Sequence, residues 1–567
     1  MWSKLEKEIQ HFTKSEQKLI HKAYTIAERF HTDQQRESGE AYISHPVAVA
    51  NILIRLQLDA ETIAAALLHD VIEDTSVSQK DIKDELGSGI ARLVEALTKL
   101  ERVRYHGFER HVESTRKMFL AVAEDIRVVL IKLADRLHNM RTIGALRPDK
   151  QKRIAQETLE LYAPLAYRLG IGEIKGELED LAFPILMKDQ HAWLVSEIKN
   201  ILPKRKEYLA RVAPIIKREL KREGVDFEIN FRVKHYYSLW RKLQRYDLDI
   251  SKVADLIALR IIVDSTEDCY RVLGLLHSLW RPVPGRIKDY IALPKPNGYQ
   301  SIHTTVFCED DVMVEFQIRT KQMHDEAEFG IAAHWVYDEK NKPKEGAHAH
   351  PDQAAWVRRL QKWQKEFAQK EGEEYIEALK IDFFKDRIFV FTPKGEVIDL
   401  PEGATPIDFA YHIHSEVGDH MTGAKVNGKM VPFSHALASG DTIEIIVQKN
   451  KTPSKDWISM AHSAMARGHI KSALRKQGIE FAKEKPKQKE PVTTIRFLCD
   501  HKRIGLLKDI TTLLSRSKIG IVRADFDHED SSKPYHTIEC TLPPRCDVNK
   551  LRTRFRRIKG VRELEIK

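Results

Sequence analysis

Cysteines are few in this sequence, and none forms a paired motif. Its 567 residues contain five cysteines, and no two of them stand in a C-x-x-C arrangement. That scatter argues against a disulfide framework and against a zinc knuckle, so we expect reduced cysteines with structural roles. They are Cys269, Cys308, Cys499, Cys540 and Cys546.

Long apolar runs are also missing. No window approaches the roughly 18 uncharged apolar residues of a membrane span, and the charged start MWSKLEKEIQ lacks the apolar core of a secretory signal. We therefore expect a cytoplasmic protein without a membrane partner. A Walker G-x-x-x-x-G-K-[ST] loop and internal repeats are absent too, which excludes P-loop phosphate binding and a repeat architecture.

The excess of positive charge is small. Lys plus Arg number 93 against 83 Asp plus Glu, a net charge of +10 with a pI near 9.0. This balance favours polyanions such as nucleotides or RNA, but solubility charge explains it equally well. Only local clusters of basic residues are therefore evidence for a polyanion partner.

The length predicts about three to five domains. Apolar residues at helical spacing predict an all-α domain, whereas strand-like runs such as ALRIIVDS alternating with helical stretches predict an α/β or α+β domain. Polar, Pro- and Gly-containing segments predict the linkers. The expected order is an all-α domain at 1–195, an α/β domain at 205–340, a linker at 341–385, a small mixed-sheet domain at 386–448, a short helical segment and linker at 449–492, and a β-α-β unit at 493–567.

Two histidines and two aspartates in the first domain suggest a metal site. His45 precedes a proline at a predicted loop-to-helix junction, His69 and Asp70 stand late in the expected helix AETIAAALLHDVIED, and Asp135 lies in KLADRLHNM. Two imidazoles and two carboxylates suit a divalent ion such as Mn²⁺ with water in its open positions. Each residue alone is more often a surface charge or a hydrogen-bonded core histidine.

Further polar residues follow these ligands at one-turn spacing. In a continuous helix Glu73 lies one turn after His69, Asp74 one turn after Asp70, and Asn139 likewise follows Asp135. A carboxylate beside a bound metal can take a proton from water or protonate a departing phosphate oxygen. Glu73 and Asp74 are the candidates for that role.

The second domain contains two basic stretches with interleaved tyrosines, RVKHYYSLWRK at 232–242 and RIKDYIALPKPNGYQSIH at 286–303. Such groups neutralise phosphates, and a tyrosine ring can stack on a purine. Asp255 and Glu315 stand at or in strand-like segments, where one carboxylate could hold Mg²⁺ and the other activate a hydroxyl. Taken alone, either stretch is more simply a solvated basic face.

The segments RESGEAYISHPVAVA, LLHDVIEDT and LADRLHNMRT resemble the HD phosphohydrolases, and the alarmone hydrolases among them. The segments DLIALRIIV, HSLWRPVPGRIKDYIALPKPNGYQSIHTTV and EFQIRTKQMHDEAEFGIAAHW resemble the alarmone synthetase domain over about 110 residues. The chain is thus identified as a member of the RelA/SpoT family. The resemblance implies hydrolysis of (p)ppGpp to GDP or GTP and pyrophosphate, with Arg36 and Asn139 binding the substrate.

For the second domain the resemblance implies transfer of pyrophosphate from ATP to the 3′-hydroxyl of GDP or GTP. It also implies that Asp255 holds Mg²⁺, that Glu315 activates the hydroxyl and that Tyr299 stacks on guanine. Arg286, Lys288 and Asp289 form the R-x-K-D variant that accompanies two-activity members of the family. The residues implied to surround the phosphates and ATP are Arg232, Lys234, Lys288, Lys295 and His303.

Residues 386–448 resemble a TGS domain and those from 493 an ACT domain. The resemblance implies that His414 contacts uncharged tRNA on a ribosome, although His414 alone could equally be an ordinary surface histidine. The expected fold is thus an all-α HD hydrolase domain, an α/β nucleotidyltransferase-like synthetase domain and two small α+β domains, TGS and ACT. Two alternatives stay open: a ribosome- or tRNA-binding regulator with dormant catalytic sites, and an HD phosphohydrolase for other nucleotides.

Overall fold

A computed structural model describes residues 1–101, 117–333 and 387–479 apart from single positions and short gaps, together with isolated positions elsewhere and the strands and helical segments between 492 and 566. The chain divides into two compact units. The first comprises 1–451 and 456–468, and the second comprises 452–455 and 469–567. No helix among the described residues is long and apolar enough to cross a membrane.

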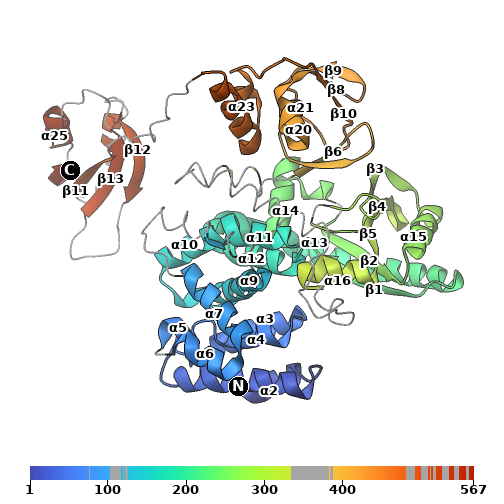
Figure 1. The fold of residues 1–567 in the computed structure, drawn as a ribbon, viewed down its shortest axis with the longest axis horizontal. Helices are drawn as coiled ribbons and strands as arrows, with labels where there is room; N and C mark the ends of the chain where they lie inside the picture. The colour runs from blue at the N-terminus through green and yellow to red at the C-terminus, as the bar shows by residue number, and fades with distance from the viewer. Residues whose placement is uncertain are drawn as a thin grey trace. The chain divides into compact units, whose positions relative to one another are not determined.

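The described N-terminal part is helical, as its apolar spacing predicts (Figure 1). Helix α2 begins with a capping box in which Thr13 and Glu16 satisfy each other's backbone N–H groups. Helices α3, α4 and α9 pack together around a core of buried aliphatic residues. The helices are α1 (Trp2–Glu8), α2 (Lys14–Phe30), α3 (Ser44–Arg55), α4 (Ala60–Leu67), α5 (Val71–Asp74), α6 (Gln79–Leu86), α7 (Ser88–Glu101), α9 (Ile126–Arg141), α10 (Pro148–Glu157), α11 (Ala163–Arg168), α12 (Gly172–Leu186) and α13 (Lys188–Arg222).

The expected single helix over AETIAAALLHDVIED is wrong in one respect, because the structure interrupts it between α4 and α5. In a continuous helix the Ala66 carbonyl would accept the Asp70 amide. Instead His69 Nδ1 lies 2.8 Å from that carbonyl, and the amide of Val71 turns back to Leu68. The side chain of His69 thus takes the place of a backbone hydrogen bond, and the chain turns at the residues that carry the candidate ligands.

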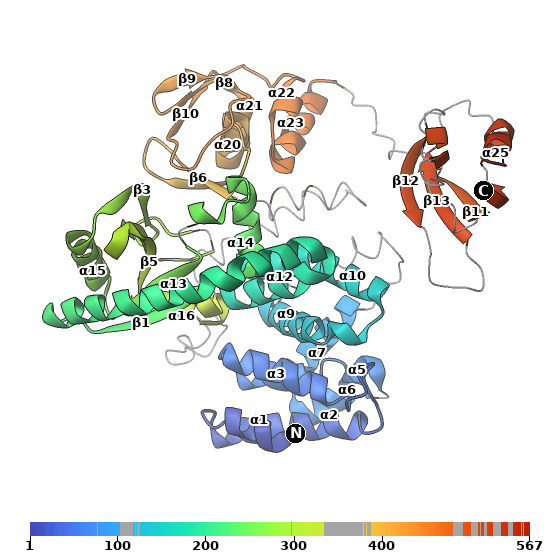
Figure 2. The same cartoon turned by 180° about the vertical axis from the view of Figure 1, so that it is seen from behind.

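A five-stranded mixed sheet follows, in the order β1-β2-β5-β4-β3. Strands β2 and β5 are parallel, and the other pairs are antiparallel. Strand β2 is buried along its whole length, and α13 and α15 pack against the sheet (Figure 2). The elements are β1 (Phe227–Val233), α14 (Tyr236–Leu243), β2 (Ile257–Val263), α15 (Thr266–Leu279), β3 (Pro282–Asp289), β4 (Ile302–Phe307), β5 (Met313–Thr320) and α16 (Lys321–Phe329).

The next segment forms a small α+β fold, consistent with the sequence reading. A two-stranded sheet pairs β6 with β7, and a three-stranded sheet has the order β10-β8-β9. Asp408 in α20 accepts the amides of His462 and Ser463, which ties the following helices to this fold. The elements are β6 (Arg387–Phe391), β7 (Val397–Pro401), α20 (Pro406–Ile413), α21 (Ser415–Asp419), β8 (Met421–Val426), β9 (Lys429–Val431), β10 (Ile443–Val447), α22 (Trp457–Met460) and α23 (Ala464–Lys476).

The second unit contains an antiparallel sheet with the order β12-β13-β11-β14. The segments TTIRFLCD and IGIVRADFDHED of the predicted β-α-β unit contain β11 and β12. In the sheet, β13 lies between these two strands and pairs with both. Part of the helical segment KDITTLLSRS lies outside the described residues. The elements are β11 (Val492–Cys499), β12 (Gly520–Asp525), β13 (Tyr535–Thr541), α25 (Val548–Arg556) and β14 (Val561–Ile566).

Candidate functional site

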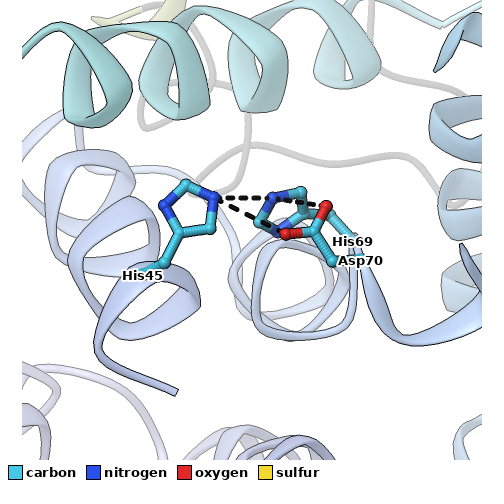
Figure 3. Close-up of side chains that lie close together, drawn as sticks. All are labelled: His45, His69 and Asp70. Atoms are coloured by element: carbon cyan, nitrogen blue, oxygen red, sulfur yellow. Dashed lines mark hydrogen bonds and ion pairs between the residues drawn. The ribbon is translucent and has the colours of Figure 1, made fainter. Parts of the chain in front are cut away.

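Four candidate metal ligands come together in the helical domain. His45 stands in the first turn of α3, His69 and Asp70 lie in the turn between α4 and α5, and Asp135 lies in α9. All four are at least nine-tenths buried. His45 Nε2 lies 3.2 Å from His69 Nε2 and 3.2 Å from Asp135 Oδ1, while His69 Nε2 lies 3.1 Å from Asp70 Oδ1. Figure 3 shows the side chains of His45, His69 and Asp70 pointing at one another.

This cluster fits a divalent cation in geometry and in charge. Ligand atoms of His45, His69 and Asp70 all lie within 4.8 Å of one another. Burial acts to raise the pKa of Asp70, but His69 outweighs it and lowers the pKa of the carboxyl. Conversely, burial acts to lower the pKa of His69, but Asp70 and Asp135 raise it to about 9. The site therefore stabilises positive charge, which is what a cation supplies.

Two side chains from α9 hold Asp135 in place. Lys132 Nζ donates to Asp135 Oδ2 at 2.7 Å, and Asn139 Nδ2 donates to Asp135 Oδ1 at 2.7 Å. Lys132 is as deeply buried as the carboxylate it meets. Burial acts to raise the pKa of Asp135, whereas Lys132 and His45 lower it, so the carboxylate stays ionised.

A cavity of about 1120 Å³ opens beside the ligands. Arg36 lines it and donates to Asn139 Oδ1 at 2.9 Å, one helical turn from Asp135. Glu73 also lines the cavity. Guanidinium and ammonium groups in the cavity lining suit the phosphates of a nucleotide. The basic side chains in the wall are Arg36, Lys132, Arg136, Lys150 and Arg153.

Tyr42 is a site residue that the sequence reasoning missed. Its hydroxyl lies 2.8 Å from Asp70 Oδ2 and 2.8 Å from Asp74 Oδ2, so it joins a candidate metal ligand to a candidate acid–base group. Burial and both carboxylates raise the pKa of this hydroxyl, which therefore keeps its proton. The signal was present in AYISHP, where the tyrosine stands three residues before His45.

In the second domain, one predicted carboxylate lies just before a strand and the other lies on the neighbouring strand. Asp255 precedes β2, and Glu315 lies in β5, which pairs with β2. Lys234 Nζ lies 2.5 Å from Asp255 Oδ2, and Lys242 Nζ lies 2.7 Å from Asp255 Oδ1. Burial acts to raise the pKa of Asp255, but the two ammonium groups lower it. Lys242 was not among the predicted site residues, although it belongs to the basic stretch 232–242.

Glu315 lies in a short chain of polar contacts across the sheet. His303 Nδ1 lies 3.3 Å from Glu315 Oε1, and Gln317 Nε2 donates to the same oxygen at 3.2 Å. Gln317 Oε1 accepts from Arg232 at 3.2 Å. Burial acts to raise the pKa of Glu315, but His303 lowers it, so the carboxylate is ionised near neutral pH.

Aromatic and basic groups gather beside this chain. Tyr299 Oη lies 2.7 Å from His303 Nε2. Lys295 Nζ lies 4.5 Å from the ring centre of Tyr290 and 4.8 Å from that of Tyr299. Burial, with Lys288 and other nearby cations, lowers the pKa of Lys295 to about 8. Tyr290 was missed by the sequence reasoning, although it stands in the quoted stretch 286–303.

Two of the remaining predicted residues of this domain lie on strands of the sheet. Arg232 in β1 pairs with Ala258 in β2, and Lys288 in β3 pairs with His303 in β4. All the residues predicted to surround the phosphates line one cleft, namely Arg232, Lys234, Lys288, Lys295 and His303, together with Asp255 and Glu315.

His414 belongs to neither cluster. It stands between α20 and α21, is exposed, and accepts the Glu416 amide with Nδ1 at 3.3 Å. That contact caps α21, which gives His414 a local structural role. Its exposed ring is also accessible to a partner.

Comparison with known proteins assigns three parts of the chain to families. A model of the HD domain matches residues 23–172, the region found in RelA / SpoT proteins matches 231–342, and the TGS domain matches 388–447. The cluster of His45, His69, Asp70 and Asp135 falls within the first match, and Asp255 and Glu315 fall within the second. These matches define the class, a multidomain protein that joins an HD domain to a RelA/SpoT region.

Relatives extend the match over most of the chain. The guanosine-3′,5′-bis(diphosphate) 3′-pyrophosphohydrolase of Aquifex aeolicus is 46% identical over 475 residues, covering 83% of this chain and 67% of the relative. The GTP pyrophosphokinase of Myxococcus xanthus is 44% identical, covering 82% and 62%. The bifunctional (p)ppGpp synthase/hydrolase SpoT of Escherichia coli K12 is 45% identical, covering 81% and 65%. The chain belongs to the RelA/SpoT family, and it spans about two thirds of the length of these relatives.

Proposed function

We propose that this chain both makes and hydrolyses guanosine 3′,5′-polyphosphates. In one direction it transfers pyrophosphate from ATP to the 3′-hydroxyl of GDP or GTP and releases AMP. In the other it cleaves (p)ppGpp to GDP or GTP and pyrophosphate. The observation that carries the proposal is the presence, in one chain, of a His/Asp metal-ligand cluster and a separate basic cleft with two carboxylates. The names of the relatives support both activities.

For hydrolysis, we assign the metal to His45, His69, Asp70 and Asp135, with Mn²⁺ as the ion. When bound, the ion supplies Lewis-acid polarisation of the phosphate and activates water near neutral pH. Arg36 and the other cations of the cavity wall bind the phosphates and orient the bond to be cleaved.

Two acidic side chains handle protons in this scheme. Asp74, which the Tyr42 hydroxyl links to the ligand Asp70, accepts the proton of the water that attacks the phosphate. Glu73, which lines the cavity, is the second acid–base candidate. Asn139 positions both Arg36 and Asp135, because it accepts from the first and donates to the second.

For synthesis, we assign Mg²⁺ to Asp255, where the ion would neutralise the phosphates of ATP. Glu315 accepts the proton of the nucleotide 3′-hydroxyl, because its carboxylate is ionised and held by His303. Tyr299 offers a face for the guanine. Positioning and charge neutralisation supply most of the catalysis in phosphoryl transfer, so the basic residues of the cleft are central to the rate. They are Arg232, Lys234, Lys288, Lys295 and His303.

We assign the domains as HD hydrolase at 1–195, synthetase at 205–340, linker at 341–385, TGS at 386–448, a short helical segment and linker at 449–492, and ACT at 493–567. We further propose that the exposed His414 contacts uncharged tRNA on a ribosome, so that the TGS domain senses amino-acid supply. Electrophoretic binding of uncharged tRNA to the wild type and to H414A tests this contact, and equal binding by both would contradict it.

The experiment that tests the two activities is nucleotide chromatography of the purified chain. Incubation with ATP, GDP and Mg²⁺ should yield ppGpp and AMP, and incubation with ppGpp and Mn²⁺ should yield GDP and pyrophosphate. Failure of both reactions, even with ribosomes and uncharged tRNA added, would favour a binding regulator with dormant sites.

A further inference from the structure

His138 contacts the metal-ligand cluster from outside. It stands in α9, three residues after Asp135, and its Nδ1 lies 2.8 Å from Nδ1 of His45. The two rings have centroids 5.0 Å apart and are tilted by 39°. His45 thus turns Nε2 toward the other ligands and Nδ1 toward His138.

A third side chain determines where the hydrogen lies between the two imidazoles. Arg36 Nη1 lies 3.2 Å from the same Nδ1 atom of His138. A guanidinium can only donate, so Nδ1 of His138 must be an acceptor without a proton. The hydrogen of the His45–His138 contact is therefore on Nδ1 of His45. This arrangement leaves the lone pair of His45 Nε2 free to bind a metal.

In the other histidine ligand, a backbone carbonyl fixes the position of the ring hydrogen. His69 Nδ1 lies 2.8 Å from the carbonyl oxygen of Ala66, which can only accept. His45 stands in the first turn of α3, and the carbonyl of Tyr42 three residues earlier accepts the amide of His45 itself. An acceptor for the His45 ring therefore has to come from another element, and α9 supplies it.

We infer that His138 is a positioning residue for the metal site: as a hydrogen-bond acceptor, it fixes the tautomer and ring orientation of His45 and joins this ligand to the substrate-binding Arg36. The inference rests on the proposed hydrolase function, in which His45 is a ligand and Arg36 holds phosphate. It predicts that a side chain at position 138 supports the metal site if it has an acceptor atom at the place of Nδ1, even when it is not an imidazole.

Three substitutions distinguish the effect of losing the acceptor from the effect of changing the side-chain volume. H138N keeps an oxygen at the place of Nδ1, H138Q moves the amide one carbon further out, and H138L removes the acceptor. Mn²⁺ affinity is measured on the full chain by electron paramagnetic resonance of the free ion during titration. Loss of an outer-shell partner costs typically about 10- to 100-fold in metal affinity, so we expect that loss for H138L and H138Q. H138N should bind Mn²⁺ close to the wild-type affinity.

Two measurements keep the outcomes distinct. Substitution of the exposed His11 by leucine controls for the loss of a surface histidine and should leave the affinity unchanged. Circular dichroism in EDTA shows whether each variant is folded. If the wild type itself fails to bind Mn²⁺, the proposed metal site is wrong. If the wild type binds and H138L binds equally well, or if folded H138N is as weak as H138L, the positioning role of His138 is wrong.

Discussion

Replacement of Lys132 by methionine should destabilise the metal-free helical domain and make the stability of the domain depend on the bound ion. Lys132 and Asp135 form a buried ion pair, with 6% and 10% of their side chains exposed and 2.7 Å between Nζ and Oδ2. Removing one partner of a buried pair typically costs about 3 to 5 kcal/mol, because the remaining charge stays desolvated after losing its ion-pair partner. A divalent cation at the cluster replaces the missing positive charge, so Mn²⁺ should restore most of the loss.

Hydrogen exchange of peptides from α9 measures this effect locally, without assuming that the whole chain unfolds in one step. In EDTA, the K132M variant should exchange faster than the wild type by about two to four decades, since about 1.4 kcal/mol corresponds to tenfold. Excess Mn²⁺ should slow exchange far more in the variant than in the wild type.

The matched control is the exposed pair between Lys150 and Glu37. Its atoms are 2.8 Å apart, but 43% and 53% of the two side chains are exposed. Such pairs contribute about 0 to 1 kcal/mol, so K150M should barely change exchange. Equal exchange of K132M and the wild type in EDTA, or the same gain from Mn²⁺ in both, would refute the reasoning.

Further substitutions divide the two activities. D255N should abolish ppGpp synthesis and keep hydrolysis, and D70N should do the reverse, as followed by chromatography of both reactions; loss of both in either folded variant would contradict two separate sites. E315Q should lower the synthesis kcat by about 10²- to 10⁴-fold, the usual contribution of a general base, with little change in the KM for ATP. Burial lowers the pKa of Lys295 to about 8, so its ammonium is present below that pH and is lost above it. The KM for ATP should therefore rise as pH passes through 8 in the wild type and stay flatter in K295R, and identical pH profiles would contradict this role.

The helical spacing and residue types predicted much of the first site. His45, His69, Asp70 and Asp135 were selected because two imidazoles and two carboxylates suit one cation, and the structure brings them together. The turn at Leu68–Asp70 was missed, because residues 60–74 contain neither Gly nor Pro and read as one helix. At the break, the His69 side chain instead of a backbone amide bonds the Ala66 carbonyl. The spacing of apolar residues gives no information about such competition between side chain and backbone.

Contacts between residues distant in sequence were also missed. His138 meets His45 across 93 residues, and Tyr42 meets Asp70 across 28. Neither pairing has a sequence spacing that a helix or strand would produce, so only the packed fold reveals it. The same holds for the strand order β1-β2-β5-β4-β3, in which β2, preceded by Asp255, pairs with β5, which carries Glu315, although 60 positions separate the two residues in sequence.

Chromatography of nucleotides after incubation of the wild-type chain tests the central claim most directly. The same preparation should convert ATP and GDP to AMP and ppGpp with Mg²⁺, and should convert ppGpp to GDP and pyrophosphate with Mn²⁺. Formation of neither product, in a preparation that is folded and supplied with ribosomes and uncharged tRNA, would contradict the proposal that this chain carries two working catalytic sites.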